Sequence, residues 1–259
     1  MKKNDIIEGE IISYGRAGEG VLKAEQFTVF VPFAIKGETV KARILKCGKN
    51  VAFAKIEQIV KPSDKRVTPL CAAFKKCGGC SLLHMDYSEQ LFYKSELIKN
   101  AFEKIGFISL DNFPEVKKSE PILGYRGKLA LPVRAGENGE VKIGFFAPNS
   151  HRVVETETCV LHGDWAEKVI SALKTYMREY KISAYDEKTK KGKIRHIVVK
   201  KSGEKYLVIL VSQSEKLSGL EFLDRLLTEK LGEHSLFLNL NTQDNNVILG
   251  EKFILKSGD

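Results

Sequence analysis

The first sixty or so residues alternate between apolar and polar positions in short runs, and this pattern restricts the fold of that region most strongly. Turn sequences such as Gly15–Gly20 and Cys47–Asn50 separate the runs. Alternation with a period of two is typical of strands with one buried face, whereas helices repeat every 3.6 residues or so. Five such runs in so short a stretch predict a small closed β-barrel of the OB type. The expected strands are Ile6–Tyr14, Gly20–Lys23, Gln26–Pro32, Thr39–Lys46 and Val51–Val60.

The barrel region is also basic. Residues 1–70 hold 13 Lys or Arg against 8 Asp or Glu, and the whole chain of 259 residues has a formal charge of +9. A basic small barrel is a common platform for single-stranded RNA, although ordinary solvated lysines would give the same composition. Arg16 lies in a glycine turn that RNA backbone can approach closely, so we expect Arg16 to contact RNA.

The chain has no segment that predicts export or membrane insertion. No uninterrupted apolar run approaches the roughly 20 residues of a membrane span, and the N-terminus lacks the apolar core of a signal peptide. The five cysteines are an odd number with uneven spacing, which is a poor disulfide framework. We therefore expect a soluble, cytoplasmic monomer.

A polar segment, Lys61–Arg66, reads as a linker to a second region with a different pattern. From residue 71 onward, strands and amphipathic helices are mixed, and mostly antiparallel pairing is expected. The predicted domains are 1–62, a barrel, and 63–259, an α+β domain. The expected helices are 88–107 with Ser88 as N-cap, 164–180 and 220–231; the expected strands are 125–133, 141–146, 152–154, 194–200, 206–212, 235–240 and 247–254.

Three of the five cysteines lie within ten residues, around a pair of glycines. Cys71, Cys77 and Cys80 bring soft ligands into one flexible loop, and Cys159 is the natural fourth. Four thiolates hold either zinc or a 4Fe-4S cluster. Structural zinc sites usually pair two CxxC-like knuckles, so three clustered ligands plus one distant cysteine favour iron–sulfur, with zinc left open. Cys47 is interpreted as a buried small hydrophobe.

The most basic segment lies between the two halves of the α+β domain. Residues 188–201 contain seven Lys or Arg and no acidic residue. Such a run entering a strand forms a track for phosphates, or else a solvated strand edge protected by lysines. The candidate RNA contacts in this run are Lys191, Lys193, Arg195 and the adjacent His196.

Several of these pieces occur in an order that resembles the RNA uracil-C5 methyltransferases. They are Gly15-Arg-Ala-Gly-Glu-Gly-Val21, Val29–Glu38, Cys71-x5-Cys-Gly-Gly-Cys80, Gly124-Tyr-Arg126, Ile143-Gly-Phe145 and Cys159. The resemblance covers essentially the whole chain. It implies a TRAM barrel, a 4Fe-4S cluster on the four cysteines named above, and RNA contacts from Arg126 and Phe145, whose guanidinium and ring suit an unstacked base. Aromatic residues at strand spacing are also common in cores.

The resemblance also implies a chemistry. In this family a cysteine thiolate attacks uracil C6, S-adenosylmethionine gives the methyl group, and a base removes the C5 proton. We find neither a glycine-rich cofactor loop nor a spare cysteine. The expectation is therefore an α+β multidomain chain holding only the N-terminal portion of the family pattern. Its C-terminal Rossmann-like methyltransferase domain would be missing, and the chain would be inactive alone.

The expected partner is RNA. Barrel and cluster together resemble the branch of the family that acts on 23S ribosomal RNA, since the transfer RNA relatives mostly lack both. The alternative is a non-enzymatic RNA-binding or ribosome-associated module with a four-cysteine zinc or iron–sulfur site.

Overall fold

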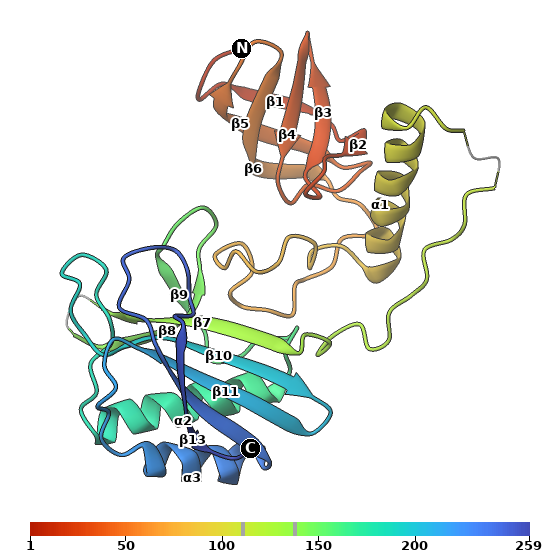
Figure 1. The fold of residues 1–259 in the computed structure, drawn as a ribbon. Coiled ribbons are helices and arrows are strands. Elements are labelled where there is room, and N and C mark those ends of the chain that lie inside the picture. The colour runs from red at the N-terminus through yellow and green to blue at the C-terminus, as the bar shows by residue number, and fades with distance from the viewer. Residues whose placement is uncertain (110–111, 137–138) are drawn as a thin grey trace. The chain divides into compact units, whose positions relative to one another are not determined.

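The computed structural model describes residues 1–109, 112–136 and 139–259 (Figure 1). Contacts divide the chain into two compact units. The first comprises Met1–Lys75 and Cys80–Ser119, and the second comprises Lys76–Gly79 and Glu120–Asp259. A division of the domains at residue 62 remains a prediction, because compactness alone groups the segment after the barrel with the barrel.

The first unit contains a six-stranded barrel. Its strand order is β1-β5-β6-β4-β3-β2, and β1 and β2 are consecutive parts of one interrupted strand, so the two edges of the sheet meet and close it. The predicted strands are confirmed to within a few residues, with the first one divided in two. Their bounds are β1 Ile6–Glu10, β2 Ser13–Tyr14, β3 Gly20–Ala24, β4 Phe27–Val31, β5 Thr39–Cys47 and β6 Val51–Lys61.

The barrel core follows from the alternation in the sequence. In β4 the buried positions are every second residue, beginning with Phe27, and β5 buries Val40, Ala42 and Ile44 in the same way. Pairing is antiparallel except between β4 and β6, which are parallel. Closing the sheet into a barrel also leaves no exposed strand edge that another chain could pair with.

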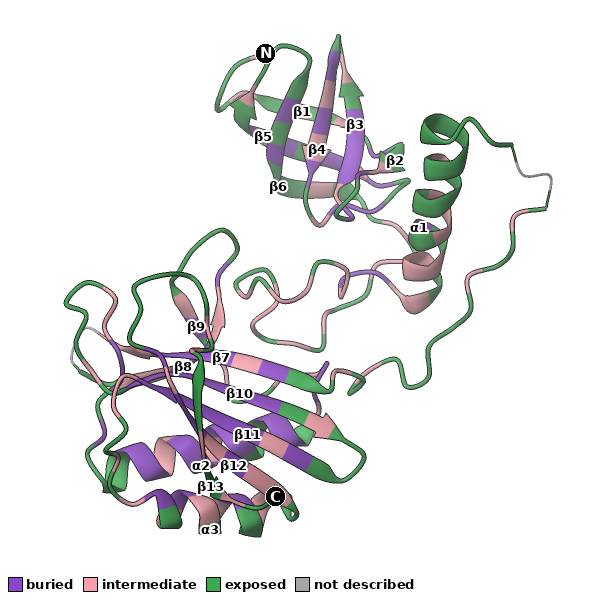
Figure 2. Cartoon of the chain, in the orientation of Figure 1, coloured by how far each residue is buried: buried purple, intermediate pink, exposed green. Residues whose placement is uncertain are grey.

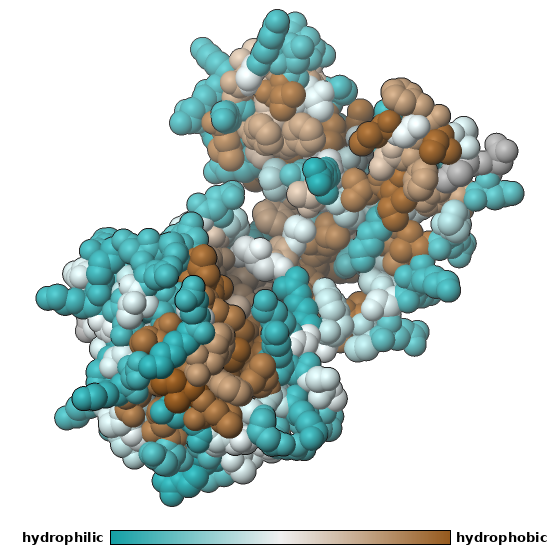
Figure 3. All heavy atoms as spheres, in the orientation of Figure 1, coloured by the Kyte–Doolittle hydropathy of each residue, from teal (hydrophilic) through white to brown (hydrophobic). Residues whose placement is uncertain are grey.

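One helix completes the first unit. Helix α1 (Tyr87–Asn100) is followed by a π-helical turn over Ala101–Ile105, instead of one helix to residue 107. The N-cap is Asp86, whose carboxylate accepts from the amide of Glu89, so the prediction of Ser88 was wrong. Tyr93 is the buried residue of this helix, and much of its length is exposed in Figure 2 and apolar in Figure 3.

The second unit is built on a seven-stranded mixed sheet. The order is β13-β12-β11-β10-β7-β8-β9, and β11 and β12 pair in parallel while the other neighbours are antiparallel. The expectation of mostly antiparallel pairing is confirmed. The strand bounds are β7 Lys128–Ala135, β8 Val141–Phe146, β9 Val153–Glu155, β10 Ile194–Ser202, β11 Lys205–Ser212, β12 His234–Leu240 and β13 Lys252–Ser257.

Two helices cover one face of this sheet. Helix α2 (Asp164–Glu179) and helix α3 (Leu220–Leu231) bury their apolar stripes against it, and the strands beneath them are mostly buried in Figure 2. Trp165, the single tryptophan, is 3% exposed in this core. Among the described residues, no helix is both long enough and apolar enough to cross a membrane. The opposite face of the sheet carries a smaller cluster around Val198, Ile209 and Val211.

Candidate nucleic-acid interface

A β-bulge in β10 determines which side chains reach the uncovered face of the sheet. Opposite β11, the register shifts between Ile194 and His196, so Arg195 is an extra residue. Ile194 and Ile197 therefore both lie in the core under the helices. His196 borders a hollow on the other side together with Ala130, which packs on the smaller cluster.

The extra residue, Arg195, has its guanidinium inside the protein. Its Nη1 donates to the carbonyl oxygens of Asn241 (3.0 Å) and Gln243 (2.6 Å), and the group lies 4.7 Å from the centre of the Tyr185 ring. Only 4% of the residue is exposed. In this position Arg195 holds the 241–250 loop, whereas Lys191 and Lys193 of the same basic run are exposed.

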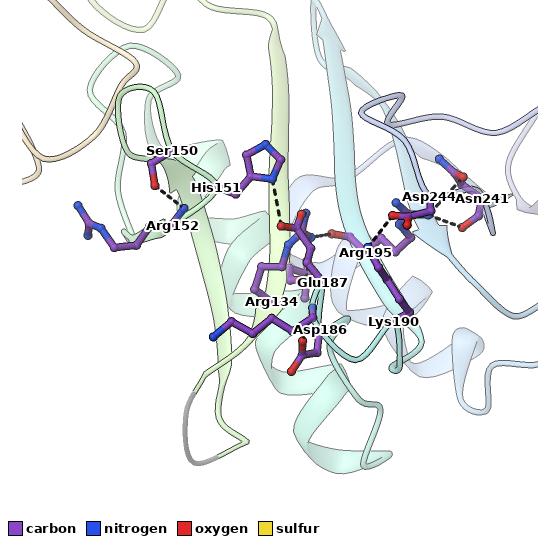
Figure 4. A network of polar contacts seen from close by, with 12 residues as sticks. Arg134, Ser150, His151, Arg152, Asp186, Glu187, Lys190, Arg195, Asn241 and Asp244 are labelled. Atoms are coloured by element: carbon purple, nitrogen blue, oxygen red, sulfur yellow. Dashed lines mark hydrogen bonds and ion pairs between the residues drawn. The ribbon is translucent and has the colours of Figure 1, made fainter.

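A polar network lies next to the bulge (Figure 4). Arg134 donates to a carboxylate oxygen of Glu187 (2.6 Å) and to the carbonyl of Arg195 (2.7 Å), and His151 Nδ1 lies 3.0 Å from the other oxygen of Glu187. Burial raises the pKa of Glu187, but the contacts with His151 and Arg134 outweigh it and hold the pKa below its ordinary value. Glu187 thus stays charged and occupies Arg134.

The hollow on the uncovered face has a volume of about 390 Å³. One wall is the backbone of Gly78 and Gly79, and another is the 145–150 segment. A Cβ on Gly78 would lie 3.1 Å from the carbonyl oxygen of Phe146, so glycine lets the cysteine loop pack closely on that segment. The sheet side of the hollow is formed by Ala130, Pro132 and His196, and Ile248 closes the remaining side.

His196 is the titratable group that borders this hollow. It is 6% exposed, and within the described part of the chain its Nδ1 has no hydrogen-bond partner. Burial, reinforced by the positive charges of Arg134 and Arg195, lowers the pKa of His196 to about 3. The imidazole is therefore neutral at physiological pH and has unused hydrogen-bonding capacity.

Two adjacent phenylalanines also border the hollow. Phe145 is stacked on His162, with ring centroids 5.9 Å apart, and packs partly on the main core. Phe146 is stacked on His151 (5.4 Å), and the Arg134 guanidinium lies 5.6 Å from its ring centre. Both rings are held in place by neighbours, as a stacking surface requires.

His162 is a site residue that the sequence reasoning missed. Its Nε2 lies 2.8 Å from the carbonyl oxygen of Lys128, which only accepts, so Nδ1 is the acceptor that receives the thiol hydrogen of Cys159 (3.0 Å). Burial lowers the pKa of His162. The three-residue spacing from Cys159 was the available signal.

The predicted metal ligands are divided between the two units. Cys71 and Cys80 belong to the first unit, and Cys77 and Cys159 to the second; all four are free of disulfide bonds and half-buried. The amide of Gly79 donates to Cys77 Sγ at 3.3 Å, a contact that suits a thiolate ligand. Across the described residues, no three Cys, His, Asp or Glu side chains are arranged to hold a metal ion. Four cysteines are nevertheless the kind of donor set that an iron–sulfur cluster takes.

The two remaining predicted RNA contacts are arginines. Arg16 is exposed on the barrel's glycine turn, and its carbonyl oxygen accepts a hydrogen bond from the hydroxyl of Tyr93 (2.7 Å), which fixes the turn. Arg126 is half-buried and donates to the carbonyl of Gly79 at 3.2 Å. Arg126 therefore braces the cysteine loop, and Arg16 is free to reach a ligand.

Comparison with known proteins indicates which class of protein this chain is similar to. Residues 7–56 match the TRAM domain model. An RNA methyltransferase of Clostridium tetani is 40% identical over 262 residues, covering 100% of this chain and 56% of the relative. One from Listeria monocytogenes is 34% identical over 97% of this chain and 56% of its own length. The chain thus spans a little over half the length of these relatives.

A solved structure is similar over nearly the whole chain. The Pyrococcus abyssi tRNA (uracil-54, C5)-methyltransferase, in complex with S-adenosyl-L-homocysteine, aligns with a TM-score of 0.70 and 25% identity over 96% of this chain and 55% of that one. The chain therefore carries a TRAM domain and is similar along its length to part of several RNA methyltransferases.

These findings correct the expected fold class. We expected a fold class that is defined by the absence of a methyltransferase domain, and this expectation was wrong. The relatives match the whole of this chain, and a uracil methyltransferase aligns with both its barrel and its mixed sheet. The expectation rested on two features that were not found, a glycine-rich cofactor loop and a spare cysteine. A short glycine loop is a weaker indicator than a match over 100% of the chain.

Proposed function

We propose that the protein acts in S-adenosylmethionine-dependent methylation of uracil C5 in RNA. The observation that carries this proposal is the alignment of 96% of the chain with a uracil-C5 methyltransferase at a TM-score of 0.70. The TRAM match over residues 7–56 and the exposed cations Arg16, Lys191 and Lys193 support a role in holding the RNA. The proposed location is the cytoplasm, where such RNA is made.

The proposed substrate is 23S ribosomal RNA. The cysteine pattern and the barrel together resemble that branch of the family. A second candidate is transfer RNA, favoured because the structural neighbour named above is a transfer RNA enzyme and aligns along the barrel as well. The barrel alone therefore does not discriminate between these substrates.

Deleting the gene and measuring 5-methyluridine in separated RNAs tests both candidates. We expect 23S ribosomal RNA to lose one 5-methyluridine by mass spectrometry of nuclease fragments, and the full-length gene to restore it. Loss from transfer RNA alone would replace the first substrate with the second. Unchanged 5-methyluridine in every RNA, with RNA binding retained by the purified chain, would favour the non-enzymatic binding module instead.

The four cysteines are proposed to hold a 4Fe-4S cluster. Four half-buried cysteines, three of them clustered in sequence, and an amide that donates to Cys77 Sγ support thiolate ligation. Anaerobic purification followed by iron, sulfide and zinc analysis tests the proposal. We expect iron and sulfide in the wild type, loss of both in Cys159→Ser, and no change in Cys47→Ser, which is the matched control. Stoichiometric zinc without iron would assign the site to zinc.

A further inference from the structure

We propose that the hollow on the uncovered face of the second unit's sheet receives one unpaired nucleobase of the bound RNA. This inference rests on the proposed RNA function and adds a base-binding site to it. The site is defined by Phe145 and Phe146 on one side and His196 on the sheet.

The dimensions and lining suit a flat ring. A volume of about 390 Å³ falls in the range of small-molecule pockets. Ala130, Pro132 and Ile248 provide an apolar surface, and Phe146 adds an aromatic ring, whereas Phe145 borders the hollow but packs partly on the main core. Aromatic side chains are the usual stacking partners of unstacked RNA bases, whereas flat bases gain little from aliphatic walls alone.

The polar side of the hollow argues for a base rather than an aliphatic ligand. His196 borders the hollow, and its buried Nδ1 has no hydrogen-bond partner among the described residues. Buried polar groups in native proteins are almost always paired, and an unpaired one at a hollow indicates a ligand. Asn149 and Ser150 add further donors and acceptors there. A base edge carries both kinds of group, and an acyl chain carries neither.

The charges next to the hollow argue against an anion. Arg134 is engaged by Glu187, and Arg195 by the carbonyls of Asn241 and Gln243. Neither arginine is among the residues that line the hollow. Lys193 is exposed three residues before His196, about 10 Å along an extended strand, where it can meet the backbone phosphate beside a bound base. The hollow thus suits the base, and the lysines suit the backbone.

The test uses the whole chain and single-stranded RNAs of about 12 nucleotides, each with one abasic position that is moved along the strand. Three variants address the site. Ala130→Leu fills the hollow, His196→Leu removes its hydrogen bonding, and His196→Asn retains a donor and an acceptor. Ser202→Leu is the matched control, because it adds the same side chain at an exposed position of β10, the strand that carries His196. Thermal unfolding confirms that each variant is folded.

We expect one abasic position to weaken wild-type binding about fivefold to a hundredfold, the usual effect of losing one stacked base. Ala130→Leu and His196→Leu should weaken binding of the intact RNA similarly, and His196→Asn and Ser202→Leu much less. In Ala130→Leu the abasic position should then cost little more, because the base has already lost its site. This non-additivity is a result that a purely structural role would not produce.

Additive losses from Ala130→Leu and the abasic position would overturn the inference while leaving the proposed RNA function intact. Unchanged RNA affinity in both leucine variants would also overturn it, and would leave a protein segment as the occupant of the hollow. If the wild-type chain binds none of these RNAs at low salt, the proposed function itself fails, and this inference fails with it.

Discussion

Both units bury polar side chains, and Glu38 in the barrel and His196 in the second sheet differ in how they are paired. In the barrel, Glu38 is fully buried and accepts from Arg66 (2.6 and 2.7 Å) and from the amide of Ile35 (2.9 Å). In the second unit, His196 is almost as buried and its Nδ1 has no partner within the described residues. A fully paired buried group stabilises a fold, whereas an unpaired group beside a hollow is positioned for a ligand.

The paired site also changes the interpretation of the segment after the barrel. Arg66 donates to the carbonyl of Phe33 as well (2.8 Å), and the amide of Ser63 lies 3.3 Å from Glu38. The polar segment that reads as a linker in the sequence is therefore fixed to the barrel. The charge of Arg66 neutralises the buried Glu38 carboxylate in the first unit. Mutation can therefore test how the paired Glu38 and the unpaired His196 differ.

The largest effect is expected from Arg66→Ala. It leaves the Glu38 carboxylate buried without its cation, which typically costs about 3–5 kcal/mol. Far-ultraviolet circular dichroism during urea unfolding reports both units, whereas fluorescence of Trp165, the single tryptophan, reports the second. We expect the circular dichroism transition to shift and the fluorescence transition to stay.

The matched control is Arg43→Ala. The ion pair of Arg43 with Glu57 is exposed, so its loss should leave both transitions nearly unchanged. An equal shift of the Trp165 transition in Arg66→Ala would contradict the view that Glu38 and Arg66 stabilise the first unit alone.

A smaller loss is expected from Asn241→Ala in the second unit. The buried side-chain amide donates to the carbonyls of Val247 (2.8 Å) and Ile248 (3.0 Å), and these would lose their partner at a cost of about 1–3 kcal/mol. The Trp165 transition measures this loss. Asn245→Ala, at an exposed position of the same loop, is the control. If the two variants unfold alike, the loop that carries Ile248 is held by other contacts.

The stability contributions of His196 and Glu38 should also depend differently on pH. The pKa of His196 is lowered from 6.5 to about 3, chiefly by burial, so the unfolded state binds the proton first. Stability of the second unit should fall by about 1.4 kcal/mol per pH unit from this group as the pH drops from about 6.5 toward 3. His196→Leu should remove that slope from the Trp165 transition. An unchanged slope would show that the imidazole is solvated.

The contribution of Glu38 to stability is expected to be lost over a different pH range. Burial raises its pKa, but the hydrogen bonds from Arg66 and from the amide of Ile35 outweigh burial and leave the pKa below its ordinary value. Its contribution is complete above the unfolded pKa of about 4.3 and is lost as the pH falls through the lower folded pKa. The difference between wild type and Glu38→Gln should therefore shrink only in strong acid.

The sequence predicted the parts of this fold that depend on local pattern. Strands such as Phe27–Val31 and helix α3 follow from period-two and 3.6-residue alternation, and their bounds agree closely with expectation. The bulge at Arg195 could not be predicted, because it depends on pairing with β11 rather than on its own residues. The pairing of Glu38 with Arg66 is equally non-local.

The candidate site was predicted by residue type but not by role. The basic run is predicted as a single RNA-contacting stretch, yet tertiary contacts turn Arg195 inward and leave Lys191 and Lys193 exposed. Phe145 and His196 do meet at one hollow, which neither strand indicates alone. His162 was missed because its three-residue spacing from Cys159 is a weak signal by itself, and its role appears only through its contacts with Cys159 and Lys128.

The smallest effects are expected from the exposed lysines, and they sharpen the contrast between surface and hollow. If Lys191 and Lys193 contact phosphates, each alanine substitution should reduce the salt dependence of single-stranded RNA affinity by about 0.7 in the logarithmic slope, without changing the effect of an abasic position. Lys190→Ala is the matched control, since Lys190 is paired with Asp244 at 2.6 Å. A slope equal to wild type in both single variants would mean that this run is a solvated edge, and the phosphate track would then have to lie on the barrel around Arg16.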